Sequence, residues 1–101
     1  MSLKTLYPKK KLVTTAGTRV QLETAVNYLN KLKIKALAAN TGVIYVGDVT
    51  VSSTSGHYAL AAGQELDLTD LFSNEHDVID VSKIYLDSSV NAEGVSFLYV
   101  K

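Results

Sequence analysis

Hydrophobic and polar residues alternate along much of this chain, which is the pattern of half-buried β-strands. The alternation is clear over residues 18–23 and again over residues 32–38, where Leu32, Ile34 and Ala36 alternate with Lys33, Lys35 and Leu37. A helix across residues 24–33 would have a poor apolar stripe, so a strand is favoured there. The β-branched and aromatic run at residues 43–46 fits a strand buried on both faces or in the core of a sandwich.

Further short strands are expected in the second half of the chain, separated by turn-forming residues. They lie at residues 49–51, 57–60, 65–68, 81–86 and 95–100. Leu66 and Leu68 should face the core while the neighbouring acidic residues face water. Seven or eight short strands at intervals of roughly 8–12 residues, without a long amphipathic helix, predict an all-β fold. A β-sandwich or small jelly roll of antiparallel strands is therefore expected, with no internal repeat.

The N-terminal residues 1–17 are predicted to form an extended basic arm outside this strand pattern. Pro8 cannot donate a backbone hydrogen bond, and the three lysines at residues 9–11 resist burial. The sandwich domain would then comprise residues 18–101. On this interpretation, deleting residues 1–15 should leave the sandwich folded but weaken assembly.

Length and composition favour one domain that acts through its surface. The chain has 101 residues and no cysteine, so it has neither disulfides nor thiolate metal ligands. No apolar run suggests a signal peptide or a membrane span, which predicts a protein made in the cytoplasm with no membrane contact. Residues 1–35 hold eight basic residues and one acidic residue, a net charge of +7, whereas residues 36–101 hold two basic and nine acidic residues, a net charge of −7. One end of the chain could therefore attract the other end of a second copy.

Candidate chemistry is sparse. Glu75, His76, Asp77 and Asp80 form a cluster of possible metal ligands, but their spacing matches neither a calcium loop nor a zinc motif, so a solvated acidic loop is the favoured interpretation. No Ser or Asp partner is evident for His57, and the glycines lack the ending of a phosphate-binding loop. No catalytic residue, metal or cofactor is predicted, and the chain is not expected to be an enzyme.

A protein interface is the kind of site that these residues favour. The lysines could bind nucleic acid only weakly without interleaved aromatic residues, whereas an arm lying over an acidic neighbour would match the charge asymmetry. Tyrosines in the arm and near a loop suit interfaces because they pair a large apolar body with a polar tip. The predicted interface residues are Tyr7, Lys9, Lys10, Lys11, Tyr58, Glu75 and Asp77.

Several segments, taken in order, resemble small β-sandwich virion proteins of tailed bacteriophages. The likeness covers about residues 16–101 and is carried by Ala16–Leu22, Thr41–Asp48, Val51–Ser53, Gly56, Leu60–Gln64, Asp80–Asp87 and Glu93–Val100. Residues 72–80 depart from it as an extra polar stretch, and the basic arm lies outside it. These motifs are glycines at turns and aliphatic residues in strands.

The resemblance implies a structural component of the virion, assembled in the host cytoplasm. A capsid decoration (cement) protein that bridges neighbouring capsid subunits is the leading expectation, with the major capsid protein as its partner. Analogy with that class suggests a homo-oligomer, and a trimer in particular. The alternatives are a tail, head-fibre or head-to-tail connection component, or a carbohydrate- or receptor-binding module that uses His57, Tyr58 and the acidic loop.

Overall fold

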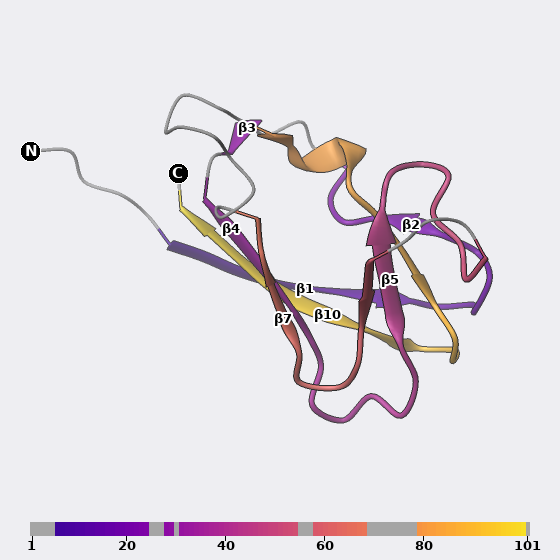
Figure 1. Cartoon of the computed structure of the whole chain (residues 1–101). Helices are drawn as coiled ribbons and strands as arrows, with labels where there is room; N and C mark the ends of the chain where they lie inside the picture. The colour runs from indigo at the N-terminus through magenta and orange to yellow at the C-terminus, as the bar shows by residue number, and fades with distance from the viewer. Residues whose placement is uncertain (1–5, 25–27, 30, 55–57, 69–78, 101) are drawn as a thin grey trace, which may run out of the picture.

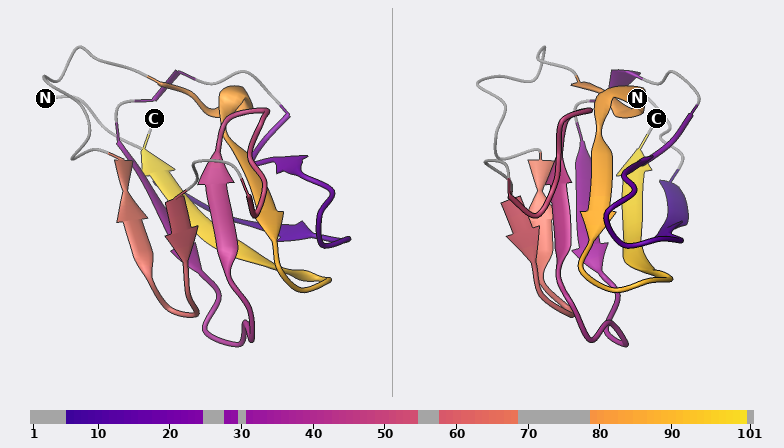
Figure 2. Two further views of the ribbon diagram at one scale, coloured as in Figure 1. Left: turned by 45° about the vertical axis from the view of Figure 1, so that its right-hand side comes forward. Right: turned by 90° about the vertical axis from the view of Figure 1, so that its right-hand side faces the viewer.

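Two antiparallel four-stranded sheets pack face to face in the computed structural model, which describes residues 6–24, 28–29, 31–54, 58–68 and 79–100 (Figures 1 and 2). The first sheet has the order β1 (Leu6–Val13), β10 (Glu93–Val100), β4 (Leu32–Ala36) and β7 (Glu65–Asp67). The second has the order β2 (Val20–Gln21), β9 (Tyr85–Ser88), β5 (Ile44–Gly47) and β6 (Tyr58–Leu60). A short ribbon joins β3 (Tyr28–Leu29) to β8 (Ile79–Asp80), which leads into the 3₁₀ turn Val81–Lys83. The predicted all-β sandwich is confirmed.

The hydrophobic core lies between the sheets and follows the alternation of the sequence. In β4, Leu32, Ile34 and Ala36 are buried while Lys33 and Lys35 are exposed, as predicted, because successive side chains of a strand point to opposite faces. The core comprises Val13, Leu22, Leu32, Ile34, Ala36, Ile44, Val46, Leu60, Leu66, Leu68, Val81, Ile84, Leu86, Val95, Phe97 and Tyr99.

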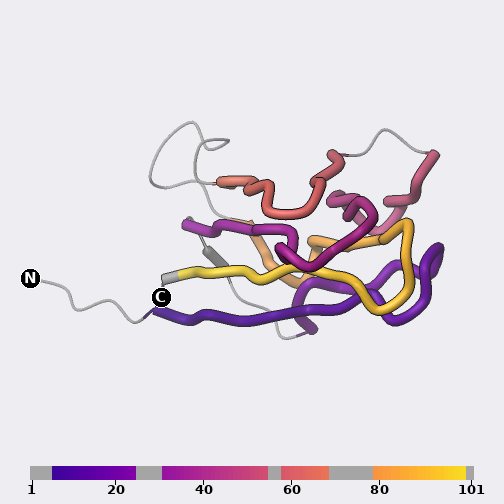
Figure 3. The backbone as a smooth tube through the Cα atoms, turned by 90° about the horizontal axis from the view of Figure 1, so that it is seen from below, coloured from indigo at the N-terminus to yellow at the C-terminus, as the bar shows by residue number. Residues whose placement is uncertain are grey.

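The predicted arm is, over Leu6–Val13, an edge strand of the first sheet. It pairs with β10 in an eight-residue register that runs from Leu6 opposite Val100 to Val13 opposite Glu93, and the two strands lie side by side along their length in Figure 3. Val13 is fully buried. A boundary at residue 17 therefore does not separate an arm from the sandwich. Pro8 and the lysines fit here because an edge strand has one side without a pairing partner, where proline and charge are tolerated.

The strand predicted over residues 49–51 and the first half of the strand predicted over residues 81–86 are instead turns closed by aspartate side chains, whereas Tyr85 and Leu86 do lie in β9. At residues 48–51 the Val51 N–H donates to the Asp48 carbonyl at 3.0 Å, and the Asp48 carboxylate accepts the Thr50 N–H at 2.9 Å. At residues 81–83 the Asp80 carboxylate accepts the Ser82 N–H at 3.0 Å and starts the 3₁₀ turn. An aspartate that bonds the backbone two residues later competes with extended pairing.

Of the two possibilities for residues 43–46, the structure has a strand with one face in the sandwich core and not one buried on both faces, since Ile44 and Val46 are buried and Tyr45 is only half-buried. β2 is shorter than the strand expected over residues 18–23. The predicted interface residues Glu75 and Asp77 lie outside the described residues, as does His57.

Candidate protein-interaction surfaces

The outer face of the first sheet gathers lysines from two strands, β1 and β4, around apolar side chains. Residues directly opposite each other in antiparallel strands share a face. Lys10 lies opposite Ser96, which lies opposite Lys35. We call this surface the basic face, and it comprises Pro8, Lys10, Lys33, Lys35, Ser96 and Leu98.

The charge of the outer face changes sign at the β7 end of the sheet. The Lys33 ammonium lies 3.6 Å from the Glu65 carboxylate and 3.9 Å from the Asp67 carboxylate. These three side chains together carry a net charge of −1, whereas Lys10 and Lys35 are both basic. The first sheet is therefore positive at its β1 end and negative at its β7 end.

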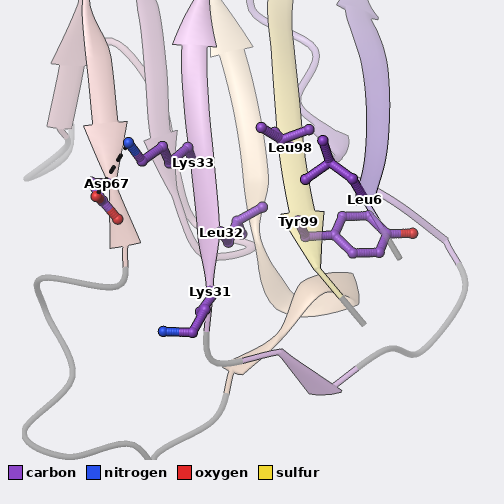
Figure 4. Close-up of a pocket in the computed structure, with 7 residues that line it drawn as sticks. All are labelled: Leu6, Lys31, Leu32, Lys33, Asp67, Leu98 and Tyr99. Atoms are coloured by element: carbon purple, nitrogen blue, oxygen red, sulfur yellow. Dashed lines mark ion pairs between the residues drawn. The ribbon is translucent and has the colours of Figure 1, made fainter. Parts of the chain in front are cut away.

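A shallow hollow of about 280 Å³ opens at one end of this face. Figure 4 shows Leu6 of β1 beside the ring of Tyr99, Leu98 on the same strand as Tyr99, and Lys33 directed toward Asp67. The Leu6 side chain is 59% exposed, so the hollow presents apolar surface to solvent next to charge. An apolar core with charged residues at its rim is the usual make-up of a protein interface.

The three consecutive lysines of β1 have three different environments. Lys9 points to the inner side of the sheet, where its ammonium lies 2.5 Å from the Glu23 carboxylate. The hydrogen bond to Glu23 raises the pKa of Lys9 above its ordinary value. Lys10 is exposed on the basic face, and Lys11 is half-buried on the inner side. Of the predicted interface lysines, Lys9 is thus held in an ion pair with Glu23 of the same chain, although its side chain is still 43% exposed.

Tyr7, also predicted as an interface residue, packs within the sandwich edge. Its ring is stacked on that of Tyr99, with centroids 5.1 Å apart, and it lies partly buried against the core. Tyr7 therefore helps to fix β1 on β10.

A cleft of about 650 Å³ opens between the sheets where β7 and β6 form their edges. We call it the inter-sheet cleft. Tyr58 is 57% exposed and lies opposite Val46 in the β5–β6 pair, so it points toward the core side at the mouth of this cleft. The volume is within the range of about 300–1,000 Å³ that is usual for ligand sites. The lining is Val46, Gly47, Asp48, Tyr58, Glu65, Leu66, Asp67, Leu68, Ile79, Lys83 and Ile84.

Other polar clusters hold loops in place. The Glu93 carboxylate accepts the N–H groups of Thr41 at 2.7 Å and Gly42 at 2.8 Å, and the Thr41 hydroxyl at 2.9 Å. These bonds, chiefly that from the Thr41 N–H, lower the pKa of Glu93. The buried Asp87 carboxylate accepts the Gly17 N–H at 2.9 Å. The segments that carry the sequence resemblance thus contain residues that stabilise turns.

Sequence reasoning missed Lys33, Lys35 and Leu98 as surface candidates. The alternation of lysines with buried residues in β4 was the available signal, but which strands flank β4 could not be deduced from it. Among the described residues, no group of three or more His, Cys, Asp or Glu side chains is placed to hold a metal ion. Nor does the part of the chain that the structure describes include a helix long and apolar enough to cross a membrane.

Comparison with known proteins identifies no relative of this chain. It matches no protein-family model, no curated protein and no solved structure.

Proposed function

We propose that this chain is a non-enzymatic structural protein of a tailed-bacteriophage particle, and specifically a capsid decoration protein that bridges neighbouring capsid subunits. The class of particle is proposed on the support of the sequence resemblance alone. The observation that carries the proposal is the basic face, on which Lys10 and Lys35 are exposed beside the half-buried Leu98. An exposed sheet face with this composition suits contact with a complementary protein surface.

The partner that this face fits is a protein surface with acidic residues around an apolar centre. Complementary charges guide docking and set its register more than they add affinity. Many copies on one shell would bind through multivalent contact, because linking modest sites on one lattice yields high avidity. The major capsid protein, which repeats over the whole shell, supplies such a lattice.

Location and copy number on the particle test this role directly. A reconstruction of particles of the virus that encodes the chain should show many copies spread over the head, with the first sheet turned toward the shell. A dozen or fewer copies at one vertex or along the tail would replace the proposal with a tail, head-fibre or head-to-tail component.

A charge-reversal variant tests the face itself. Lys35→Glu should weaken binding to particles stripped of the protein by about ten-fold or more, because it places like charge against an acidic partner. Arg19→Glu, an exposed site outside the basic face, is the matched control and should bind like the unaltered protein. Equal binding by both variants would exclude the basic face as the contact surface.

The alternative role, binding of a carbohydrate or receptor, can be tested at the inter-sheet cleft. Binding to glycans that is lost in Tyr58→Ala, while particle binding is unchanged, would support the alternative of a carbohydrate-binding module.

A further inference from the structure

The two edges of the first sheet carry opposite charge. β1 and β7 are the terminal strands of its order. Lys10 and Lys11 lie on β1, while Glu65 and Asp67 lie on β7. A strand edge is a surface on which another chain can continue a sheet, so opposite charges on the two edges of one sheet suit contact between copies of this chain.

The backbone of β1 is arranged for such a contact. The Gly94 carbonyl accepts hydrogen bonds from the Leu37 N–H at 3.1 Å and the Asn40 side chain at 2.8 Å, both on the side away from β1. Gly94 and its opposite residue Leu12 are therefore a non-hydrogen-bonded pair. Hydrogen-bonded and non-hydrogen-bonded pairs alternate along an antiparallel ladder. The backbone N–H and C=O groups of Leu12 and Lys10, and the C=O group of Pro8, therefore point toward the outer edge of β1. Pro8 lacks a backbone N–H, but because its position faces the outer edge, this costs no hydrogen bond to β10.

The side chains of β1 restrict what can pair with it. Lys10 lies on the outer face and Lys11 on the inner side. Two β1 strands related by a twofold axis would bring their lysines together, and like charges opposite each other destabilise a strand pair. The β1 edge therefore favours an acidic neighbour over a second β1.

The β7 edge has the complementary features. Glu65 and Asp67 face the outer side with Lys33, and that group of three carries a net charge of −1. On the inner side of β7 lies the inter-sheet cleft, with buried Leu66 in its lining and the acidic Asp48 at its rim. The edge thus presents carboxylates on the outer side and apolar surface on the inner side.

We propose that this chain self-associates head to tail, with the β1 edge of one copy docked beside β7 of the next. Lys10 then adjoins Glu65 and Asp67 on the outer side of the joined sheets. Lys11 lies over the inter-sheet cleft, with its aliphatic stem on the apolar lining and its ammonium toward Asp48. Exposed Leu6 and Leu12 add apolar area at the two ends of the β1 edge.

A head-to-tail contact uses two different surfaces of each copy. Such contacts close into a ring when the rotations add up to a full turn and otherwise continue as a filament. This inference deepens the proposed decoration role, since a ring would present several basic faces at once. Its test uses purified protein without particles, so its failure would leave the particle-binding proposal standing.

Cross-linking distinguishes this arrangement from a twofold dimer, and the absence of native cysteine makes the result easy to interpret. Lys10→Cys and Glu65→Cys proteins, mixed and treated with a short bifunctional maleimide, should give cross-linked dimers that contain one of each. Neither protein alone should cross-link. Dimers of Lys10→Cys alone would overturn the proposal, as would the absence of cross-linking in the mixture.

Charge exchange provides a second measurement, by sedimentation over a range of protein and salt concentrations. Lys10→Glu and Glu65→Lys should each raise the dissociation constant of self-association about ten-fold, and the double variant should recover most of that loss. Added salt should weaken the association of the unaltered protein. Thermal melting of each variant controls for folding. A protein that is monomeric throughout, or single variants that associate unchanged, would contradict the inference.

Discussion

The ring of Tyr7 stacks on the ring of Tyr99, with centroids 5.1 Å apart and planes inclined by 17°. This contact joins β1 to β10, strands from opposite ends of the described chain. Lys9 reinforces it, because its ammonium lies 6.0 Å from the centre of the Tyr99 ring and is paired with Glu23. The N-terminal strand is therefore held to the sandwich by backbone pairing, aromatic packing and charge.

Deletion of residues 1–13 should abolish cooperative thermal unfolding, in contrast to what an arm outside the sandwich predicts. The deletion removes the entire pairing partner of one side of β10 and exposes core residues that β1 covers. Circular dichroism melting measures the result. A truncated protein that still melts cooperatively would show that β1 is dispensable.

Point substitutions in β1 refine this prediction. Val13→Ala should lower the free energy of unfolding by about 2 kcal/mol, because it deletes buried methyl groups and leaves a cavity. Lys10→Ala, on the same strand but exposed, should change it by less than about 0.5 kcal/mol. Denaturant titration of the two variants provides the comparison, and equal effects would contradict the assignment of Val13 to the core.

Gly94 is required because two backbones approach closely at its position. A Cβ atom there would lie 2.0 Å from the Lys11 carbonyl oxygen. Gly94→Ala should therefore destabilise the protein by about 2–3 kcal/mol through forced separation of β1 and β10. Denaturant titration measures the change.

Ala92, two residues earlier in the same hairpin, is the matched control. Its φ of 60° lies in the left-handed region, which glycine adopts without steric cost. Ala92→Gly should leave stability unchanged or raise it by up to about 1 kcal/mol. A greater loss from Ala92→Gly than from Gly94→Ala would refute this account of the hairpin.

Glu93 should make the protein sensitive to acid. Its pKa is lower in the folded protein than the ordinary value of 4.5, so its stabilising effect is fully present above that value and is lost as the pH falls through the folded pKa. Asp48, whose pKa is also lowered by bonds from Thr50, acts in the same sense at lower pH. The melting temperature of the unaltered protein should therefore decrease as the pH is lowered below about 4.5.

The Glu93→Gln variant isolates this contribution. It should melt at a lower temperature than the unaltered protein at pH 7, because an amide is a weaker acceptor for the Thr41 and Gly42 N–H groups. Its melting temperature should also depend less on pH below 4.5. Parallel curves for the two proteins over that range would show that Glu93 does not carry the effect.

The alternation of residues was enough to predict the sandwich and the inward side chains of β4. It failed at residues 49–51 and 81–83, where the composition is typical of strands but an aspartate side chain bonds the backbone two residues ahead. Such a bond is local, yet the hydrophobic pattern does not distinguish a segment that turns in this way from a segment that continues as a strand.

The surroundings of the three lysines of β1 could not be predicted from the sequence. Their charge, and the excess of basic residues near them, can be read directly from the chain. Pairing with β10 then directs Lys9 to Glu23, Lys10 to the basic face and Lys11 to the inner side. Side chains alternate between the two faces of any strand, but the residues that each side chain meets on its face depend on the neighbouring strands.

The sequence by itself determined the fold class, the core-facing residues of its regular strands and the opposite charges of its two parts, because period and charge are local properties. Only the tertiary structure decided that β1 lies beside β10 and that β1 and β7 form the two edges of one sheet. Strand order joins residues far apart in the chain, and the free energy that selects it comes from packing both sheets around one shared core.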